Sequence, residues 1–187
     1  GNVVVTSQGY IRTLLDTDGD GRADSSTLFA ATRTGGMGMC FDGPSLYFVG
    51  DGALFRFEDA DGNGVADGPP QRLLSMEFLE HGGHAVRKGP DGWLYVVVGN
   101  ETTITNEHAR LPGSPIMRAE AGALLRLAPG GGGSEIIADG FRNPYDFDFN
   151  SFGDVFTYDS DVEADYFLPW YTPTRIYHVA HGGHHGW

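Results

Sequence analysis

The sequence predicts an all-β protein built from repeated hairpins. Glycine accounts for 29 of the 187 residues and the apolar runs are short, so we expect many short strands joined by tight turns. Three segments begin with glycine and an alternating apolar run: GYIRTLLD from Gly9, GALFRFED from Gly52 and GALLRLAP from Gly122. Each continues through a polar turn to a second short apolar run, and this order of elements predicts a hairpin.

A second repeated unit follows each hairpin. Its three copies are RTGGMGMCFDGPSLYFVG from Arg33, HGGHAVRKGPDGWLYVVVG from His81 and FRNPYDFDFNSFGDVFTYD from Phe141, and in each copy two strands flank a turn. Four strands that recur at this spacing are typical of a β-propeller, in which each blade is a four-stranded sheet that faces a central axis. An open β-sandwich with similar hairpins is the alternative.

The repeat divides the chain into propeller units at about residues 9–50, 52–99 and 122–159, with the start of another at 168–187. We therefore expect residues 1–187 to form a partial β-propeller domain with about three to four blades. Because a propeller ring normally needs four or more blades, further blades outside this chain or pairing with another copy are expected. The long connection from Thr102 to Ala121 departs from the repeat and is expected to shape one face.

The composition is acidic. A formal net charge of −13 and an isoelectric point near 4.7 argue against a nucleic acid or an anionic membrane surface as partner, because both would be repelled. No stretch is apolar for long enough to cross a membrane. Cys40 is the single cysteine, so an intrachain disulfide is impossible. The chain opens GNVVV, without an initiator methionine or a signal segment, which suggests a mature or excised product.

Two of the polar turns carry alternating carboxylates, the hard oxygen ligands that calcium prefers. The candidate metal ligands are Asp16, Asp18, Asp20 and Asp24 in the first turn and Asp59, Asp61, Asn63 and Asp67 in the second. An EF-hand loop would have glutamate at its twelfth position, where these turns have Thr27 and Pro70. A bound calcium ion would be structural, because the third copy has PGGGGS instead. Plain Asp-Gly and Asn-Gly turns without metal are the alternative.

A further acidic cluster follows in YDSDVEAD. Its candidate metal ligands are Asp159, Asp161, Glu163 and Asp165. Carboxylates this close repel one another unless a cation or a basic side chain intervenes, so metal binding and a solvated acidic loop both remain open.

Three basic side chains occupy equivalent places in the second repeated unit. Superposing the copies on their aliphatic strands aligns Arg33, His81 and Arg142. In a propeller these side chains would converge at the mouth of the central channel, where arginine can hold a carboxylate in bidentate fashion and histidine can act as a general base. The alternative is that His81 or His84 merely forms a hydrogen bond with a neighbouring loop.

Several motifs together resemble the soluble quinoprotein glucose/sorbosone dehydrogenase family. They are His81 eight residues before GPDG, a strand that ends in Gly99-Asn100, and GFRNP from Gly140. More narrowly, the DxDGDGxAD hairpins, GPDGWLY, GFRNPYDFDFNSFGDVFTYDSDVEAD and LPWYTPTRIYHV resemble the membrane-bound dehydrogenase propeller domain of planctomycete-type bacteria, which is often fused to a cytochrome c. The resemblance implies a six-bladed propeller that binds pyrroloquinoline quinone (PQQ) with calcium over its channel.

The resemblance also implies roles for single residues. His81 matches the catalytic base, which takes the proton of the sugar's anomeric hydroxyl as hydride passes to the quinone. Arg142 and Asn143 match residues that contact the quinone. Asn100, expected beside the cofactor, stands where the glucose enzymes carry an acid, and Tyr145 stands where they carry a polar amide. Both departures argue against glucose as the substrate.

Two features of the chain depart further from the family. The basic residues that later blades contribute are not found in this chain, so the cofactor site would be incomplete and this fragment inactive. GGHHGW replaces the acid-aromatic pair expected after Gly-Gly, and His184-His185 is interpreted as a metal or channel feature particular to this protein.

The sequence thus predicts a PQQ- and calcium-dependent dehydrogenase that oxidises a sugar or another alcohol or aldehyde. By resemblance we expect a cytochrome c as electron acceptor and a periplasmic or extracellular location. The alternative is a non-catalytic, calcium-stabilised propeller that binds a protein or a glycan. Hydrolysis as in lactonase propellers is a weaker option, because the aligned channel positions are basic rather than carboxylate.

Overall fold

The fold is that of a computed structural model, which describes residues 2–160, 162, 167–170 and 173–187. The described residues form four antiparallel sheets. The first sheet contains β1 (Val3–Ser7), β2 (Tyr10–Leu15) and β3 (Ser25–Ala30). The second contains β4 (Gly36–Asp42), β5 (Ser45–Gly50), β6 (Ala53–Glu58) and β7 (Gln71–Ser75).

The third sheet contains β8 (Gly83–Lys88), β9 (Leu94–Val98), β10 (Gly122–Leu127) and β11 (Ser134–Phe141). The fourth contains β12 (Phe147–Phe149), β13 (Val155–Asp159) and β14 (Arg175–His178). A short 3-10 turn, η1 (Pro129–Gly131), joins β10 and β11.

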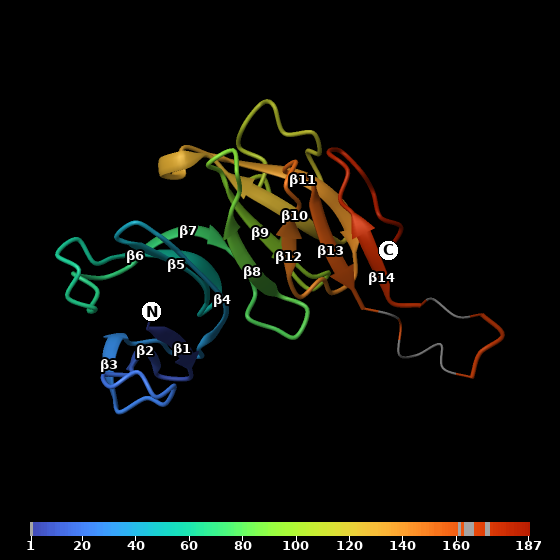
Figure 1. The fold of residues 1–187 in the computed structure, drawn as a ribbon. Coiled ribbons are helices and arrows are strands. Elements are labelled where there is room, and N and C mark those ends of the chain that lie inside the picture. The colour runs from blue at the N-terminus through green and yellow to red at the C-terminus, as the bar shows by residue number, and fades with distance from the viewer. Residues whose placement is uncertain (1, 161, 163–166, 171–172) are drawn as a thin grey trace.

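The sheets follow one another along an arc in chain order, from β1–β3 at the lower left of Figure 1 to β12–β14 at the right. Within each sheet, strands that are consecutive in the chain are hydrogen-bonded neighbours. This arrangement of meandering sheets is that of blades in a β-propeller. The prediction of an all-β, partial propeller is therefore confirmed. No helix among the described residues is long and apolar enough to cross a membrane.

The sheets are offset by two strands from the predicted units. Residues 9–50, for example, span β2 and β3 of the first sheet and β4 and β5 of the second. Each complete sheet instead begins with the second repeated unit and ends with the hairpin that follows it. The physical reason is the tight turn at Asp51-Gly52, which places β6 directly beside β5, with Gly50 paired to Ala53.

Strand β9 shows why the central strands are apolar throughout. All five of its residues are buried. Val96 and Val98 belong to the apolar cluster shared with the second sheet, whereas Tyr95 and Val97 belong to the cluster shared with the fourth. Because successive side chains of a strand point to opposite faces, a blade with neighbours on both sides needs apolar residues at every position.

Glycines allow β4 and β8 to approach closely. A methyl group at Gly38 would lie 2.2 Å from the carbonyl oxygen of His84. A methyl group at Gly99 would lie 2.5 Å from the carbonyl oxygen of His81. Any side chain at these two positions would force the backbones apart, so Gly38 lets β4 approach β8, and Gly99 lets the end of β9 approach the loop before β8.

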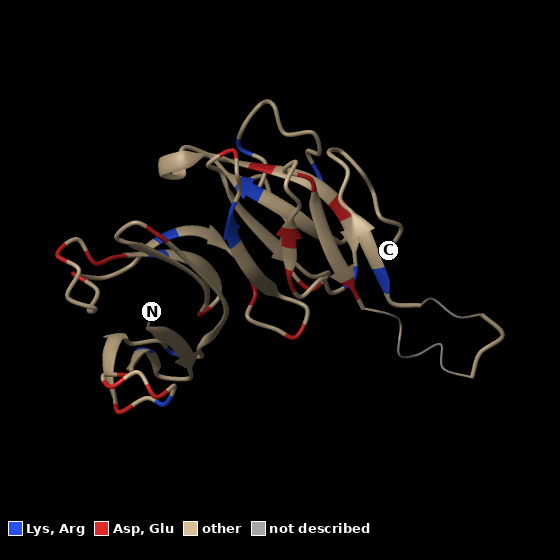
Figure 2. Ribbon diagram, viewed as in Figure 1, with Lys and Arg blue, Asp and Glu red and all other residues tan. Residues whose placement is uncertain are grey.

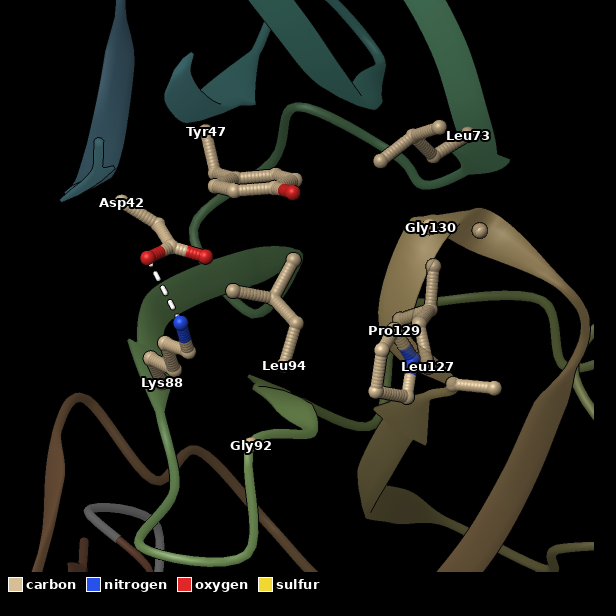
Figure 3. Close-up of a pocket in the computed structure, with 11 residues that line it drawn as sticks. Asp42, Tyr47, Leu73, Lys88, Gly92, Leu94, Leu127, Pro129 and Gly130 are labelled. Atoms are coloured by element: carbon tan, nitrogen blue, oxygen red, sulfur yellow. Dashed lines mark hydrogen bonds and ion pairs between the residues drawn. The ribbon is translucent and has the colours of Figure 1, made fainter. Parts of the chain in front are cut away.

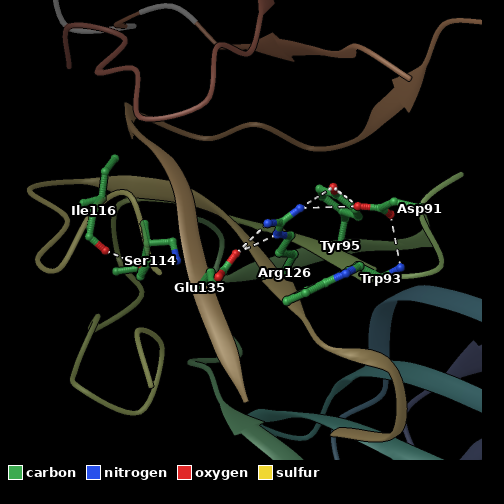
Figure 4. A network of polar contacts seen from close by, with 8 residues as sticks. Asp91, Trp93, Tyr95, Ser114, Ile116, Arg126 and Glu135 are labelled. Atoms are coloured by element: carbon green, nitrogen blue, oxygen red, sulfur yellow. Dashed lines mark hydrogen bonds and ion pairs between the residues drawn. The ribbon is translucent and has the colours of Figure 1, made fainter. Parts of the chain in front are cut away.

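A polar network stabilises the end of the third sheet at which the turn between β8 and β9 lies (Figure 4). The Arg126 Nε donates to Glu135 Oε2 at 2.8 Å, and its Nη1 donates to Asp91 Oδ2 and to the Tyr95 hydroxyl, both at 3.3 Å. The guanidinium carbon lies 4.2 Å from the centroid of the Trp93 ring. One arginine thereby ties the turn between β8 and β9 to β10 and β11.

The connection over residues 102–121 folds against the third sheet and the edge of the second. The Ser114 hydroxyl donates to the Ile116 carbonyl at 2.6 Å and accepts from the Ile136 N–H at 2.9 Å (Figure 4). The buried His108 ring places Nε2 2.9 Å from the Ser75 carbonyl oxygen on β7. The connection therefore bridges neighbouring blades.

Candidate functional site

Three loops meet at the ends of the inner strands, and we call them the rim: residues 33–37 before and into β4, 81–84 before and into β8, and 142–145 before β12. The buried His84 joins all three. Its Nδ1 lies 3.1 Å from the Met37 Sδ, and its Nε2 lies 2.7 Å from the Asn143 Oδ1. Its ring also packs on Tyr145, with ring centroids 5.1 Å apart. The rim is thus a contiguous structure across three sheets.

His81 is held at both its backbone and its ring. Its N–H donates to Glu101 Oε2 at 2.9 Å, and Glu101 N–H donates back to the His81 carbonyl at 3.1 Å. Its Nδ1 lies 2.7 Å from the side-chain amide of Asn100. The Asn100 backbone N–H donates to the Arg142 carbonyl at 2.8 Å. Asn100 therefore joins the loop of His81 to the loop of Arg142.

Asp159 positions the loop of Arg142 and Asn143. Its carboxylate is 5% exposed and accepts the backbone N–H of Arg142 at 2.8 Å and of Asn143 at 2.7 Å. The Arg142 Nη1 donates to the Ser160 hydroxyl at 2.7 Å, and its guanidinium carbon lies 5.6 Å from the centroid of the Trp187 ring. A carboxylate at the end of β13 thus fixes the backbone from which both rim side chains project.

Arg33 lies one residue away from its predicted equivalence with His81. Phe41 of β4 pairs with Leu46, whereas Lys88 of β8 pairs with Leu94. The turn between β4 and β5 is therefore one residue shorter than the turn between β8 and β9. Counted back along the strands, Thr34 corresponds to His81, and the sequence superposition missed this because it ignored the turn length.

Arg33 remains on the rim beside Asp51. The Arg33 N–H and the Thr34 N–H and hydroxyl all donate to the Asp51 carboxylate, at distances of 2.7 to 3.0 Å. Burial acts to raise the pKa of Asp51, but the hydrogen bonds from Thr34 and Arg33 outweigh it and lower the pKa overall. This carboxylate stays ionised and holds the first rim loop as Asp159 holds the third.

Burial also governs the charge of His84. The surrounding protein removes water from the ring and lowers the pKa of His84, although the hydrogen bond with Asn143 opposes the shift. His84 is therefore neutral at pH 7 and serves as a hydrogen-bonded link between loops.

The two acidic loops lie at the opposite end of the sheets from the rim. They connect β2 to β3 and β6 to β7, and the red segments in Figure 2 mark the acidic residues on these loops. Two groups of three carboxylates have ligand atoms within 4.8 Å of one another: Asp16, Asp18 and Asp24, and Asp59, Asp61 and Asp67. The two remaining candidates, Asp20 and Asn63, are not in these groups and accept the N–H groups of Arg22 and Val65. A cation in either loop would not touch a ligand at the rim.

Of the third acidic cluster, Asp159 alone lies among the described residues. Asp161, Glu163 and Asp165 lie outside the described residues. Asp159, the remaining candidate ligand, uses both carboxylate oxygens to accept backbone N–H groups of the rim loop.

Residues near the C-terminus complete the rim, and the sequence pattern did not identify their contacts. Trp187 places its indole Nε1 3.0 Å from the Asn100 side chain. His184 places Nδ1 2.9 Å from the carboxylate of Asp139, which is 4% exposed. His185 stacks on Phe141 with ring centroids 4.6 Å apart. The unusual GGHHGW motif marked this segment, but its reach to Asn100 depends on the fold.

Two cavities lie between the inner strands. A hollow of about 200 Å³ adjoins the rim and is lined by residues 37–40, 85–87 and Asp146. A smaller cavity of about 90 Å³ lies at the far end, between Tyr47, Leu94 and Pro129, where Lys88 Nζ and Asp42 Oδ1 form an ion pair at 2.6 Å (Figure 3). The first hollow shares Met37 with the rim, and a further cavity of about 20 Å³, whose lining includes Asp159, Ser160 and Trp187, borders the loop of Arg142.

The rim carries groups of the kinds that a planar, carboxylate-bearing ligand such as PQQ needs. Arg142 has a guanidinium, which can bind a carboxylate in bidentate fashion, and Asn143 has an amide, whereas the Asn100 amide is used by His81, Arg142 and Trp187. His81 adds a ring nitrogen at the same place.

The chain matches a family model described as Domain of unknown function (DUF7133) over residues 2–180. No curated protein sequence matches the chain.

Solved structures with the same fold include sugar dehydrogenases. An oxidoreductase of Thermus thermophilus, described as a glucose dehydrogenase, matches with a TM-score of 0.65 and 22% identity, over 100% of this chain and 61% of that chain. The PQQ-bound aldose sugar dehydrogenase of Streptomyces coelicolor matches with a TM-score of 0.64 and 16% identity, over 100% of this chain and 59% of that chain.

A calcium-binding protein, regucalcin, from Agrobacterium tumefaciens matches with a TM-score of 0.59 and 13% identity, over 98% of this chain and 59% of that chain. At these identities the likenesses show the fold alone. The chain spans about three fifths of the length of each of these structures.

Proposed function

We propose that this chain, which belongs to the family described as Domain of unknown function (DUF7133), is part of a PQQ- and calcium-dependent dehydrogenase that oxidises a sugar or another alcohol or aldehyde. The observation that carries this proposal is the meeting of His81, Asn100 and Arg142 at one point of the rim. The rest of the ring and of the cofactor site would come from beyond the three fifths of the fold that this chain spans.

Each rim residue has a separate task in this proposal. Bound PQQ would supply a two-electron acceptor. Arg142 would hold a carboxylate of the ligand, and Asp159 keeps its backbone in place. His81 would accept the hydroxyl proton of the substrate at a ring nitrogen. Asn100 stands where the glucose enzymes carry an acid, so the substrate is proposed to be a sugar or alcohol other than glucose.

Calcium in the acidic loops would have a structural task. The grouped carboxylates of the β2–β3 and β6–β7 loops lie among glycine turns at the far end of the sheets. An ion there would relieve repulsion within each loop and would stabilise the outer hairpins. A periplasmic or extracellular location and a cytochrome c acceptor belong to the same proposal, with the resemblance of the motifs as their support.

The test uses PQQ titrated into the full-length protein with calcium, followed by dye reduction across a panel of sugars and alcohols. Arg142→Gln should weaken PQQ binding by roughly tenfold to a hundredfold, because a charge-assisted pair is lost. His81→Gln should leave PQQ binding intact and slow turnover by about a hundredfold or more. Arg12→Gln on β2 is the matched control, because the Arg12 guanidinium contacts Ser26 and Tyr10 within the first sheet.

Two outcomes would overturn the proposal: no binding of PQQ, or activity that does not depend on His81. The second candidate, a non-catalytic calcium-stabilised propeller that binds a protein or glycan, is favoured by the two grouped acidic loops. Under that alternative, chelation should lower the melting temperature while PQQ has no effect.

A further inference from the structure

The side-chain amide of Asn100 lies among three groups whose hydrogen-bonding roles differ. The Trp187 indole Nε1 can only donate, and the Arg142 carbonyl oxygen can only accept. The third neighbour, His81 Nδ1, can do either, depending on the tautomer. Two of the three neighbours therefore decide which way the amide points.

One amide orientation satisfies all three groups. In it, Asn100 Oδ1 accepts from Trp187 Nε1 at 3.0 Å, and Nδ2 donates to the Arg142 carbonyl at 3.1 Å. The same Nδ2 donates to His81 Nδ1 at 2.7 Å. The reverse orientation would set an N–H against the indole N–H and an oxygen against the carbonyl oxygen, leaving both contacts repulsive.

This orientation determines the tautomer of His81. A neutral imidazole has one N–H and one acceptor nitrogen. Because His81 Nδ1 accepts from Asn100, its proton is on Nε2. In that form the ring can donate a hydrogen bond through Nε2 but cannot take a proton there.

His184 shows the opposite arrangement in the same protein. Its Nδ1 lies 2.9 Å from the Asp139 carboxylate, which can only accept. The proton of neutral His184 is therefore on Nδ1, and its Nε2 is the acceptor. A carboxylate partner and an amide partner thus select opposite tautomers of two histidines.

We propose that Trp187 and Asn100 form a tautomer lock that holds His81 as an Nε2–H donor in the ligand-free protein. A half-turn of the Asn100 amide would break its bond with Trp187 and present Oδ1 to His81. Nδ1 would then take a proton from solvent while Nε2 releases one, so the net proton count is unchanged and Nε2 becomes an acceptor. Trp187 and Asn100 are positioning residues in this scheme.

The lock rests on the proposed function and adds a condition to it. The resting His81 favours a ligand group that accepts a hydrogen bond, such as a carbonyl or carboxylate oxygen. Acceptance of a hydroxyl proton at Nε2 requires the lock to open first. An alcohol substrate would therefore react only after the contact between Asn100 and Trp187 has been broken.

The test is the tautomer of His81 in the ligand-free, full-length protein with ¹⁵N-labelled histidine, read from long-range ¹⁵N–¹H correlations at pH 8, where an ordinary histidine is neutral. In the native protein the Nε2–H form should exceed the Nδ1–H form by about tenfold. Asn100→Asp should reverse the ratio, because a carboxylate cannot donate. Trp187→Phe should lower the ratio severalfold, because the indole donor is lost while the Arg142 carbonyl still favours the same amide orientation. His184 should remain Nδ1–H in all samples.

Nδ1–H as the main form of His81 in the native protein would overturn the lock, as would an unchanged ratio in Trp187→Phe. If Trp187→Phe fails to fold, the native protein and Asn100→Asp still decide the result. Absence of PQQ binding would sink the proposed function and leave the tautomer result standing. PQQ binding with the wrong tautomer would sink only the lock.

Discussion

Each of the three rim loops is held by a carboxylate, but two are held by an aspartate and the middle one by a glutamate. Asp51 holds the loop of Arg33 and Thr34, and Asp159 holds the loop of Arg142 and Asn143. In the middle loop, Glu101 takes over the backbone of His81, and Asn100 is left to bind the imidazole ring.

The two kinds of residue differ in role: the aspartates stabilise the loops, whereas Asn100 contacts the imidazole ring of His81. An aspartate that accepts backbone N–H groups uses its oxygens to hold the fold. In the middle loop the residue equivalent to Asp51 is Gly99, since Asp51 N–H donates to the Gly35 carbonyl and Gly99 N–H donates to the Gly82 carbonyl. The side chain of Asn100, one residue further on, contacts His81, Trp187 and the Arg142 carbonyl instead. The middle loop is therefore the one where a change should affect the site more than the fold.

The largest expected effect is that of Asp159→Ala. The variant leaves the N–H groups of Arg142, Asn143 and Ser160 without their buried acceptor, so the free energy of unfolding should fall by about 3 kcal/mol. Urea unfolding followed by circular dichroism measures it. The exposed Asp148→Ala in the same sheet should change the free energy by less than about 0.5 kcal/mol. Equal effects of the two variants would contradict the comparison.

Asp51→Asn removes the carboxylate that holds the first loop. Asp51 has a φ of 51°, which asparagine tolerates, so the change tests the carboxylate rather than the backbone. The free energy of unfolding should fall by about 2 kcal/mol at pH 7, because an amide nitrogen cannot accept the Thr34 or Arg33 bonds.

The same variant has a pH signature. The folded-state pKa of Asp51 lies below its ordinary value of 3.8, so the unfolded chain binds a proton first as the pH falls. The stabilisation by Asp51 is complete above 3.8 and is lost as the pH falls through the lowered folded-state pKa. The difference in the free energy of unfolding between the variant and the native protein should therefore be smaller at pH 3 than at pH 7. Unfolding curves at both pH values measure it.

Asn100→Ala should cost less stability, about 1 kcal/mol, since the Asn100 backbone bond to Arg142 and the Glu101 bond to His81 remain. Its effect should appear instead at the ring of His81, whose tautomer preference would be lost. Unfolding and histidine ¹⁵N spectra on one sample measure both. A loss of stability as large as that of Asp159→Ala would show that the middle loop is not special.

The smallest expected effect concerns His84. Its folded-state pKa lies below the ordinary value of 6.5, so the unfolded chain takes up a proton that the folded chain does not as the pH falls below 6.5. The native protein should lose stability between pH 7.5 and pH 5.5, and His84→Gln should lose less. Thermal unfolding at both pH values measures the loss of stability. An equal loss in the native protein and in His84→Gln would show that His84 does not link the loops as a neutral ring.

The sequence by itself determined the all-β class and the repeat, because hairpin turns, glycines and alternating apolar runs act over a few residues. It also placed His81 and Arg142 at equivalent positions of the repeat, whereas Asn143 was indicated by the family resemblance. It misplaced Arg33 by one residue, since the register of β4 depends on a turn one residue shorter than its counterpart.

Only the tertiary structure decided which strands share a sheet and which polar groups meet at the rim. Trp187 lies far along the chain from Asn100, and the return of the C-terminal segment to Gly140, whose carbonyl accepts the Trp187 N–H at 3.0 Å, brings them together. Local patterns set strands and turns, but a hydrogen-bond partner is selected by distance in space. For that reason the residue that orients Asn100, and through it His81, was not visible in the sequence.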